Sequence, residues 1–381
     1  VKLLGVVHTA PSDASELYAD VVRIENPLDT ADLIAAVDEL QRRHGAPVRI
    51  IGILEAMMVQ LAQVRAHFKV PGTPVHVAEL FRDKSRMKEA LAKAGLPVAR
   101  NRLLHNGSDA KEFAHEVGFP MVLKPPAGMG AKSTFRIRSL AELGQALEGM
   151  RASSQNPVLA EEFLVGREFS FETLTVNGEI KMHSISHYLP ACLEVLENPW
   201  MQWCCMLPRD ISGPEYDPIR DLAKRTIQAL GLDSGVTHME WFQRQDGSLA
   251  IGEIAMRPPG ANISIMTGLV HDMNLFDAWV NAVVNDRFLE SPTGAWDRRY
   301  AAGSAFLRGM GRGRVAGVTG VAECQRQLGP SVVEAKIPTI GAHKSDSYEG
   351  DGYVIVKDQS TDVVKHLLST VISTVRVFYA D

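Results

Sequence analysis

One hairpin constrains the fold of this chain more than any other local feature of its sequence. Residues 236–255 read VTHMEWFQRQDGSLAIGEIA, two runs of strand-forming residues on either side of Asp246 and Gly247. An Asp-Gly pair is typical of a two-residue hairpin turn, in which both central residues take positive φ angles. A symmetric turn at this pair places Glu240 directly opposite Glu253, whereas a β-bulge would break that register. The sequence therefore predicts two carboxylates side by side on neighbouring strands.

Two glutamates in direct opposition need a compensating charge. Their Cβ atoms would lie about 4.5–5.5 Å apart, and like charges at that distance are destabilising. Mg²⁺ would compensate them, because it binds carboxylate and phosphate oxygens; the alternative is a solvated strand face with both glutamates in water. Arg257, four residues after Glu253, falls on the same face of an extended strand and suits anionic oxygens. We therefore predict that Glu240 and Glu253 are metal ligands beside a bound anion.

Size and composition exclude several classes of protein. With 381 residues the chain is too long for one ordinary core, and 45% hydrophobic with 22% charged residues is the composition of a globular protein. A net charge of −5 gives no reason to expect nucleic acid or an anionic membrane as a partner. No uninterrupted apolar run reaches the roughly 18 residues of a membrane-spanning helix, and the apolar start VKLLGVVHTA lacks the features of a signal peptide. Cysteines without metal-ligand spacing indicate a reduced, cytoplasmic protein.

The order of predicted helices and strands divides the chain into three parts. Residues 1–78 alternate strand and helix, with a third strand predicted at residues 47–53 (PVRIIGI), which is typical of an open α/β domain. Residues 79–300 form the central part, which contains a smaller α+β unit at about 109–158. Residues 301–381 read as strands and turns closed by one helix, a small C-terminal α+β region. The predicted fold class is therefore a mixed α/β and α+β multidomain protein.

A lysine and a glycine-rich loop suit a phosphate group. Lys124 ends the predicted strand PMVLK and points at the loop PPAGMGAKST. In this loop Gly128 and Gly130 let backbone N–H groups turn toward an anion. The loop lacks the GxxxxGK[ST] spacing of a P-loop, and by itself it is only a tight turn. Beside a carboxylate pair that needs a cation, it becomes part of a nucleotide-binding hypothesis.

The run AEEFLVGREFSFE offers groups for the rest of a nucleotide. Alternation along a strand places Glu162 and Leu164 on the opposite face from Glu161. Backbone groups at such a position can contact the edge of an adenine, and Glu168 can bind ribose hydroxyl groups. Each glutamate taken alone is more simply solvated, so the hypothesis depends on the order of these residues along the chain.

This order of motifs resembles that of the ATP-grasp superfamily. Across residues 79–263 the matching motifs are RDK with Lys84, VLKP with Lys124 and its glycine loop, EEFLVGRE, and Glu240 and Glu253 followed by Arg257. THMEWF, the Asp-Gly turn and GEIAMRPPG are most similar to the carboxylate–amine ligase branch, which includes L-amino-acid (dipeptide) ligases and biotin-carboxylase-like enzymes. The resemblance implies a pre-ATP-grasp domain at residues 1–78, then the ATP-grasp fold with the unit at about 109–158 as its lid.

The resemblance also implies a role for each matched residue. Two lysines would hold the phosphates of ATP, the glycine loop would cover the β- and γ-phosphates, and the run after it would bind adenine and ribose. Glu240 and Glu253 would bind Mg²⁺, or Mn²⁺ in its place, and Arg257 would act with Lys124 in catalysis by stabilising an acyl phosphate. The residues in the ATP-binding roles are Lys84, Lys124, Gly130, Ser133, Thr134, Glu161, Glu162, Leu164 and Glu168.

One position departs from the pattern of the superfamily. An asparagine usually stands two residues after the second metal-binding glutamate, and here that residue is Ala255. One metal ion would therefore lose a ligand or take water in its place. His238, opposite Ala255 in the predicted register, stands where this branch often has a histidine. It either orients a ligand or is a core histidine.

The activity that the resemblance implies is ATP-dependent ligation of a carboxylate to an amine through an acyl phosphate, with release of ADP and phosphate. The partners would be small molecules, amino acids or similar compounds; homodimers are common in this branch, although no sequence feature here requires one. Three alternatives stay open. They are bicarbonate as the activated carboxylate, a thiol or hydroxyl acceptor, and a regulatory nucleotide-binding protein without catalysis, for which Ala255 is the argument.

Residues 190–208 (PACLEVLENPWMQWCCMLP) show no clear periodicity. An apolar segment of this length is either a lid or binding loop, or a loop packed on a neighbouring domain.

Overall fold

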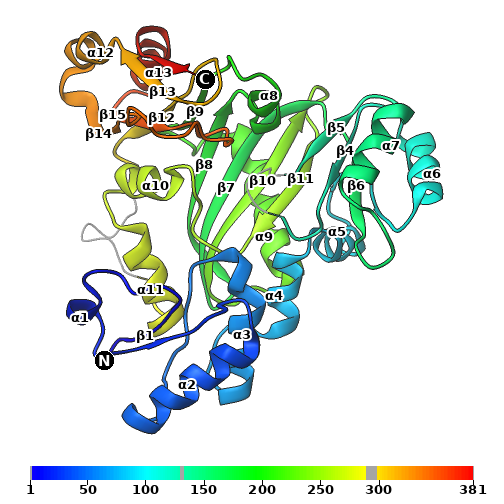
Figure 1. Cartoon of the computed structure of the whole chain (residues 1–381), viewed down its shortest axis with the longest axis vertical. Coiled ribbons are helices and arrows are strands. Elements are labelled where there is room, and N and C mark those ends of the chain that lie inside the picture. The colour runs from blue at the N-terminus through cyan, green and yellow to red at the C-terminus, as the bar shows by residue number, and fades with distance from the viewer. Residues whose placement is uncertain (1, 129–132, 289–297, 381) are drawn as a thin grey trace.

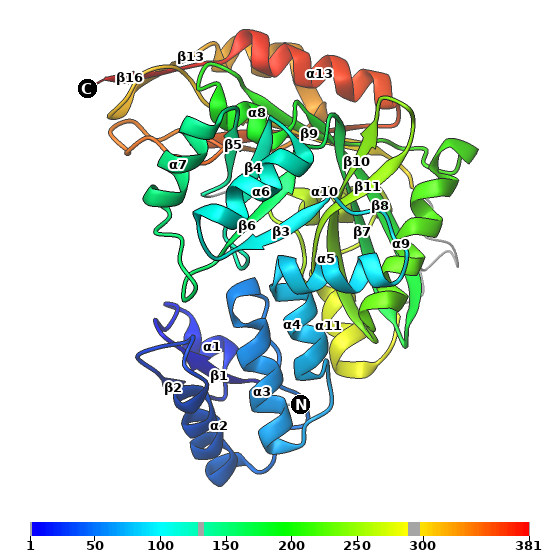
Figure 2. The same cartoon turned by 90° about the vertical axis from the view of Figure 1, so that its right-hand side faces the viewer.

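The structure is a computed structural model of the chain, and it describes residues 2–128, 133–288 and 298–380 (Figure 1). A long antiparallel sheet runs through the middle of the molecule. The N-terminal residues lie at one end of this sheet, a small sheet lies beside it, and the C-terminal residues lie at its other end (Figures 1 and 2). Within the three described ranges, no helix has both the length and the apolar character needed to cross a membrane.

The N-terminal part is built on a pair of parallel strands. β1 (Leu4–Val7) pairs with β2 (Asp20–Arg23), and the helices of this part are α1 (Ala14–Leu17), α2 (Thr30–His44), η1 (Glu55–Met57) and α3 (Met58–Phe68). The strand predicted at residues 47–53 is wrong, because this segment forms no strand and leaves Val48 and Ile51 63% and 39% exposed. Instead, Arg65 Nη1 donates to the carbonyl oxygen of Ile50 at 3.1 Å, so a helix side chain takes the place of a neighbouring strand.

A four-stranded antiparallel sheet forms the small unit of the central part. Its strands in spatial order are β3 (Asn101–Leu104), β6 (Val158–Glu162), β4 (Met121–Lys124) and β5 (Phe135–Ile137), with helices α6 (Gly107–Val117) and α7 (Leu140–Gly149) packed on one face. Alternation along β4 decides what each face carries. Met121 and Leu123 are 0% exposed in the core with the helices, so Lys124 points to the other side.

An eight-stranded antiparallel sheet forms the centre of the molecule. Its strands in spatial order are β11 (Leu249–Ala255), β10 (Gly235–Arg244), β7 (Gly166–Val176), β8 (Glu179–Leu189), β9 (Trp203–Leu207), β12 (Ala301–Leu307), β15 (Gly352–Asp358) and β14 (Val332–Lys336). β7 and β8 meet at Asn177 and Gly178, whose φ angles of 51° and 75° are those of a tight hairpin turn. The last three strands come from the C-terminal residues, so that part continues the sheet that carries the β10–β11 hairpin.

Helices cover the central sheet and bury its apolar side chains. α9 (Asp217–Leu230), α4 (Val75–Arg82) and α5 (Lys84–Lys93) pack in one core with β7, β10 and β11, which includes Phe171, Trp241 and Ile254. The remaining elements are α8 (Cys192–Glu197), η2 (Pro214–Tyr216), α10 (Ile263–His271), α11 (Leu275–Asn285), β13 (Arg314–Thr319), α12 (Val321–Leu328), η3 (Gly329–Ser331), α13 (Thr361–Thr374) and β16 (Arg376–Ala380).

The β10–β11 hairpin pairs Glu240 with Glu253 as predicted, but through two offsets rather than a symmetric turn. The backbone N–H of Arg244 donates to the carbonyl of Ser248 at 2.8 Å, so the turn is one residue longer than predicted. A bulge directly after Glu240, with Gly252 as the extra residue of β11, restores the register. The predicted opposition of the carboxylates is therefore confirmed. The predicted two-residue turn is wrong, because three residues separate Arg244 from Ser248; the Gly252 bulge compensates for the extra one.

Candidate active site

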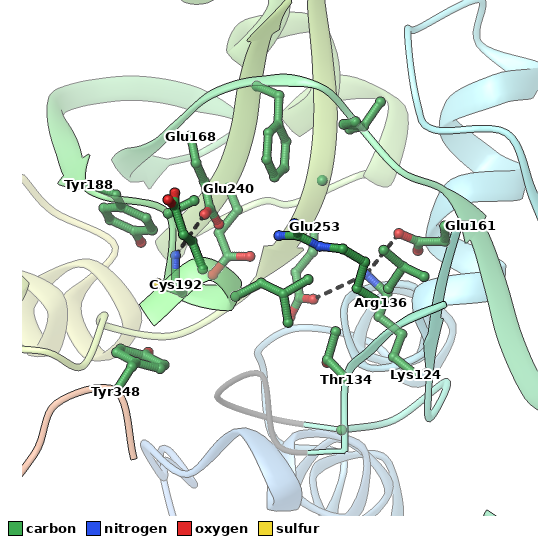
Figure 3. A pocket seen from close by; sticks show the side chains of 18 of the residues that line it. Lys124, Thr134, Arg136, Glu161, Glu168, Tyr188, Cys192, Glu240, Glu253 and Tyr348 are labelled. Carbon is green, nitrogen blue, oxygen red and sulfur yellow. Dashed lines mark hydrogen bonds and ion pairs between the residues drawn. The ribbon is translucent and has the colours of Figure 1, made fainter. Parts of the chain in front are cut away.

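The predicted ATP-binding and metal-binding residues surround one cavity of about 1120 Å³. Figure 3 shows it from close by, with Glu240 and Glu253 between residues of the small sheet and the tyrosines of the far wall. One predicted residue, Gly130, lies outside the described residues. The predicted residues that line the cavity are Lys84, Lys124, Ser133, Thr134, Glu161, Glu162, Leu164, Glu168, Glu240, Glu253 and Arg257.

The opposed glutamates are partly neutralised by two lysines. Lys84 Nζ and Lys124 Nζ lie 3.2 Å and 3.9 Å from the carboxylate oxygens of Glu253. Glu240 and Glu253 keep 33% and 23% of their side chains exposed, so both remain open to a ligand. In the described part of the chain, no three His, Cys, Asp or Glu side chains come together as a metal site. The pair fits Mg²⁺, which commonly takes one or two carboxylates and completes its shell with phosphate oxygens and water.

A helix cap places Lys84 at the cavity. The carboxylate of Asp83 accepts hydrogen bonds from the backbone N–H groups of Ser85 and Arg86, so α5 begins at Lys84. Lys84 Nζ donates at 2.9 Å to the carbonyl of Gly128, at the start of the loop predicted to cover the phosphates. The cap thus directs the first side chain of the helix toward that loop.

A buried chain of charges joins Lys124 to Lys88 through Glu161. Lys124 Nζ lies 3.0 Å from Glu161 Oε2, and Lys88 Nζ lies 3.2 Å from Oε1. Burial raises the pKa of Glu161, but the two lysines outweigh it and hold this pKa below its ordinary value. Burial lowers the pKa of Lys124, but Glu161 and Glu253 outweigh it and raise this pKa. Both groups are therefore charged at neutral pH, and the Glu161 carboxylate serves to hold the lysines.

The other carboxylates of the β6–β7 segment have different surroundings. Glu162 is paired with Arg100 and Arg244 at 2.8 Å and 3.0 Å. Glu168 is buried and accepts a hydrogen bond from the backbone N–H of Cys192 at 3.0 Å (Figure 3). Burial, and to a smaller extent the charge of Glu240, raises the pKa of Glu168 to about 8. Its carboxyl group is therefore largely protonated at neutral pH and can donate a hydrogen bond, for example to a hydroxyl group.

His238 lies opposite Ala255, as predicted, and is both buried and paired. Its Nδ1 is 2.9 Å from Glu172 Oε1, and its Nε2 is 3.8 Å from Glu240 Oε1. Burial alone lowers the pKa of His238, but the hydrogen bond with Glu172 and the nearby carboxylate of Glu240 outweigh it and raise this pKa to about 9. Because His238 lines the cavity and its Nε2 lies within 4 Å of Glu240, the structure favours orientation of this glutamate over a purely core role.

Arg257 follows the end of β11 at the cavity wall. Its Nε donates to Glu55 Oε2 at 2.9 Å, and its Nη1 donates to the carbonyl of Pro258 at 3.1 Å. Glu55 belongs to the N-terminal part, and no sequence pattern links it to Arg257.

Other residues of the site also escaped the sequence analysis. Tyr188, Cys192 and Tyr348 line the far wall, and burial raises the pKa of each well above its ordinary value, so all three stay neutral. Tyr348 comes from the C-terminal part, and no local signal connects it with a nucleotide site. Lys88 did carry a signal, since it stands four residues after Lys84 and so shares one face of α5 with it.

Residues 190–208 both line the cavity and enter the core. Cys192 of α8 lines the cavity, whereas Trp203 of β9 is 0% exposed in the central sheet. Glu197, the last residue of α8, lies 3.0 Å from Arg138 beside the small sheet. The expectation of a loop is therefore wrong for most of this segment: it forms α8 beside the cavity and then β9, a strand of the central sheet itself.

Comparison with known protein families finds one match, which covers most of the residues that carry this cavity. Residues 89–263 match the family described as the ATP-grasp domain. These residues form an ATP-grasp domain. The domain contains the opposed glutamates, Lys124 and the β6–β7 segment, and Lys84 lies just before its first matched residue.

Proteins similar to this chain include ligases. Over 240 residues the chain is 30% identical to the L-arginine-specific L-amino acid ligase of Bacillus subtilis, an alignment that covers 62% of this chain and 57% of that protein. The chain thus spans little more than half the length of that relative.

Solved structures share the ATP-grasp fold along the whole chain. The L-amino acid ligase from Bacillus licheniformis has a TM-score of 0.80 at 18% identity, with 100% of this chain and 99% of that chain covered. The ADP complex of N5-carboxyaminoimidazole ribonucleotide synthetase has a TM-score of 0.71 at 17% identity, with 98% and 90% covered. The predicted mixed multidomain fold class is confirmed by these likenesses.

Proposed function

We propose that the chain is an ATP-dependent carboxylate–amine ligase that joins amino acids or amino-acid-like substrates and releases ADP and phosphate. The observation that carries this proposal is the opposition of Glu240 and Glu253, flanked by Lys84 and Lys124, on the wall of a cavity of about 1120 Å³. Ligand pockets commonly measure roughly 300–1,000 Å³, so this cavity has room for ATP and a second small molecule.

The charged residues of the cavity suit a polyphosphate. Lys84 and Lys124 lie within 4 Å of the Glu253 carboxylate and would pair with phosphate oxygens on the same side, next to Thr134. Glu240 and Glu253 would hold Mg²⁺, which supplies neutralisation of phosphate charge when bound. The protonated carboxyl group of Glu168 would donate to a ribose hydroxyl group.

Phosphoryl transfer requires positioning and charge stabilisation more than a protein nucleophile. The substrate carboxylate attacks the γ-phosphorus of ATP, the bond to the bridging oxygen breaks, and ADP leaves with that electron pair. The product is an acyl phosphate, a mixed anhydride. Arg257, which lines the cavity, would bind its phosphate oxygens and stabilise their charge.

Amide formation then completes the reaction in the same cavity. A neutral amine attacks the acyl carbon, phosphate leaves with the electron pair of the C–O bond, and the amine loses a proton. Water would compete with the amine for the acyl phosphate, so exclusion of solvent matters. The ion pair of Arg138 with Glu197 at 3.0 Å joins the small sheet to α8 over the cavity and would restrict access of water.

The substrate class is supported by the relatives named above. Two of these proteins are L-amino acid ligases, one of them specific for L-arginine, and one of the two shares the fold over the whole chain. Amino acids are therefore the first compounds to supply as carboxylate and amine.

The test is phosphate release from Mg-ATP in the presence of single amino acids and amino-acid pairs, with mass spectrometry of the products. Release that requires two amino acids, with a product mass equal to their sum less one water, is the expected result. Glu253→Gln is the control and should release no phosphate above background. Release that requires bicarbonate, a thiol or an alcohol instead of an amine would assign another acceptor. Silence across the panel with ATP still bound would contradict the ligase proposal and favour a regulatory nucleotide-binding protein.

A further inference from the structure

A carboxylate of the N-terminal part is buried behind the cavity wall. Glu55, the first residue of η1, is only 5% exposed and lies between two arginines. Its Oε2 accepts a hydrogen bond from Arg257 Nε at 2.9 Å, and its Oε1 is 3.6 Å from Arg82 Nη1. Arg257 lines the cavity, whereas Glu55 is not among the described residues that line it. Glu55 therefore reaches the site through its arginine neighbours.

Arg82 extends this contact to the phosphate loop. Its Nη2 donates to the carbonyl of Ala127 at 2.7 Å, and its Nη1 donates to that of Gly128 at 3.4 Å. Gly128 also accepts the hydrogen bond from Lys84 at 2.9 Å. Glu55 thus lies between the arginine after β11 and the residues that enter the loop predicted to cover the β- and γ-phosphates.

We propose that Glu55 is a positioning residue that acts through Arg257 and holds its guanidinium where the phosphoryl group passes from ATP to the substrate carboxylate. This inference rests on the role proposed above for Arg257. A free arginine side chain samples many rotamers, and ordering it has an entropic penalty. Hydrogen bonds from Nε to Glu55 and from Nη1 to the carbonyl of Pro258 order it before any ligand arrives. A charge ordered in advance stabilises a transition state without reorganisation.

A purely structural ion pair is the alternative. A buried carboxylate paired with an arginine can also hold two parts of a chain together, and here Glu55 joins the N-terminal part to the central part. The two roles differ in what they change. A structural role affects unfolding and the binding of every ligand alike, whereas a positioning role affects the ligands that meet Arg257.

The experiment measures the binding of orthovanadate, a mimic of the transferred phosphoryl group, to the full chain saturated with Mg-ADP. Glu55→Gln keeps the shape of the side chain and removes its charge. We expect this variant to bind vanadate about tenfold more weakly or worse, since small displacements of a positioned group have effects of this size, with Mg-ADP affinity unchanged. The matched control is Glu39→Gln, which removes the exposed partner of Arg43 in the same N-terminal part and should bind both ligands like the wild type.

The same substitution made in an Arg257→Ala variant separates a positioning role of Glu55 from a purely structural one. If Glu55 acts through Arg257, Glu55→Gln should weaken vanadate binding no further when Arg257→Ala is already present, because residues that act as a unit are not additive. Two results would overturn the positioning role. One is an equal loss of Mg-ADP and vanadate affinity in Glu55→Gln. The other is a loss of vanadate affinity on adding Glu55→Gln to Arg257→Ala that is as large as the loss in the wild type. Should Glu55→Gln fail to fold, Glu55→Asp keeps the charge on a shorter side chain and should show the same selective loss in smaller degree.

Vanadate binding and phosphate release by the wild type distinguish a failure of the role of Glu55 from a failure of the proposed function. One outcome would contradict the proposed ligase function and still support the role of Glu55. In that outcome the wild type and its variants bind vanadate as expected, but none of the amino acids or pairs makes the wild type release phosphate from ATP. A wild type that binds Mg-ADP and no vanadate would overturn the role of Glu55, because the phosphoryl group would then not meet Arg257.

Discussion

Lys88 Nζ donates a hydrogen bond of 2.7 Å to the carbonyl oxygen of Gly252, the residue that bulges out of β11. A bulged residue has no direct partner in the strand ladder, so a side-chain donor at this point stabilises the irregularity. Lys88 is 0% exposed and also lies 3.2 Å from Glu161. One buried lysine therefore joins α5, β6 and β11, and with them the bulge on which the opposition of Glu240 and Glu253 depends.

Lys88→Met should destabilise the protein strongly. The substitution keeps an unbranched side chain but leaves Glu161 and the Gly252 carbonyl without one of their buried partners. We expect the free energy of unfolding to fall by about 3–5 kcal/mol, the range for breaking a buried charge pair, in urea denaturation followed by circular dichroism. Lys93→Met, on the same helix but in an exposed pair with Glu89, is the control and should change little. Equal effects of both substitutions would show that Lys88 does not stabilise the hairpin.

Glu253→Gln should abolish turnover while leaving a cooperative unfolding transition. A neutral amide is a poorer partner for Mg²⁺ and for the two lysines than a carboxylate is. Phosphate release at saturating Mg-ATP and substrates should fall at least about 100-fold, because several kcal/mol of charge stabilisation are lost. Glu89→Gln on the surface of α5 is the matched control. Unchanged kinetics in Mg²⁺ would remove Glu253 from the metal site.

Lys124→Ala should weaken nucleotide binding. A hydrogen bond to a charged group contributes about 1.5–3 kcal/mol, so the dissociation constant for Mg-ATP should rise about tenfold or more in isothermal titration calorimetry. Lys93→Ala, which removes an exposed lysine outside the cavity lining, should leave the dissociation constant unchanged. If the affinity of Lys124→Ala equals that of the wild type, Lys124 does not contact the phosphates.

Glu168 should make the ligand-free protein less stable as the pH rises. Burial raises its pKa from 4.5 to about 8 in the folded protein. Below pH 4.5 both the folded and the unfolded states hold the proton. Above it the unfolded state releases the proton first, so the stability that Glu168 contributes is lost progressively up to about pH 8. Melting temperatures measured from pH 5 to 8.5 in EDTA would follow this loss.

Glu168→Gln provides the comparison, because an amide is neutral at every pH. This variant should melt close to the wild type at pH 5 and at a higher temperature at pH 8, where only the wild type carries the penalty. Parallel melting curves across the whole range would contradict a raised pKa for Glu168.

The opposition of Glu240 and Glu253 shows how much of the site could be predicted from local sequence patterns. Strand-forming runs, an Asp-Gly turn and two carboxylates within one short segment were enough to predict their pairing, which the structure confirms. The predicted turn was one residue too short, and the register survives only because the Gly252 bulge offsets the extra residue. Lys88, 164 residues away in the chain, donates a hydrogen bond to that bulge. The helix cap at Asp83 is equally local, because its hydrogen bonds to Ser85 and Arg86 lie within three residues.

The third strand expected at residues 47–53 shows where local pattern fails. Its apolar, β-branched residues favour an extended chain, and the chain there does not form a helix. A strand also needs a neighbour to complete its ladder, and that neighbour is a property of the packed fold. Here the segment leads into η1 and so delivers Glu55 to the central part.

By itself, the sequence determined most of the local elements, the motif order of an ATP-grasp domain and a large part of its cavity lining, because hairpins, caps and motifs depend on residues close together in the chain. Only the tertiary structure decided how these groups are held. Glu55 meets Arg257 across 202 positions, and Tyr348 reaches the cavity from the C-terminal part. Such contacts arise from the packing of separate elements around shared cores, and no periodicity or spacing within one segment encodes them.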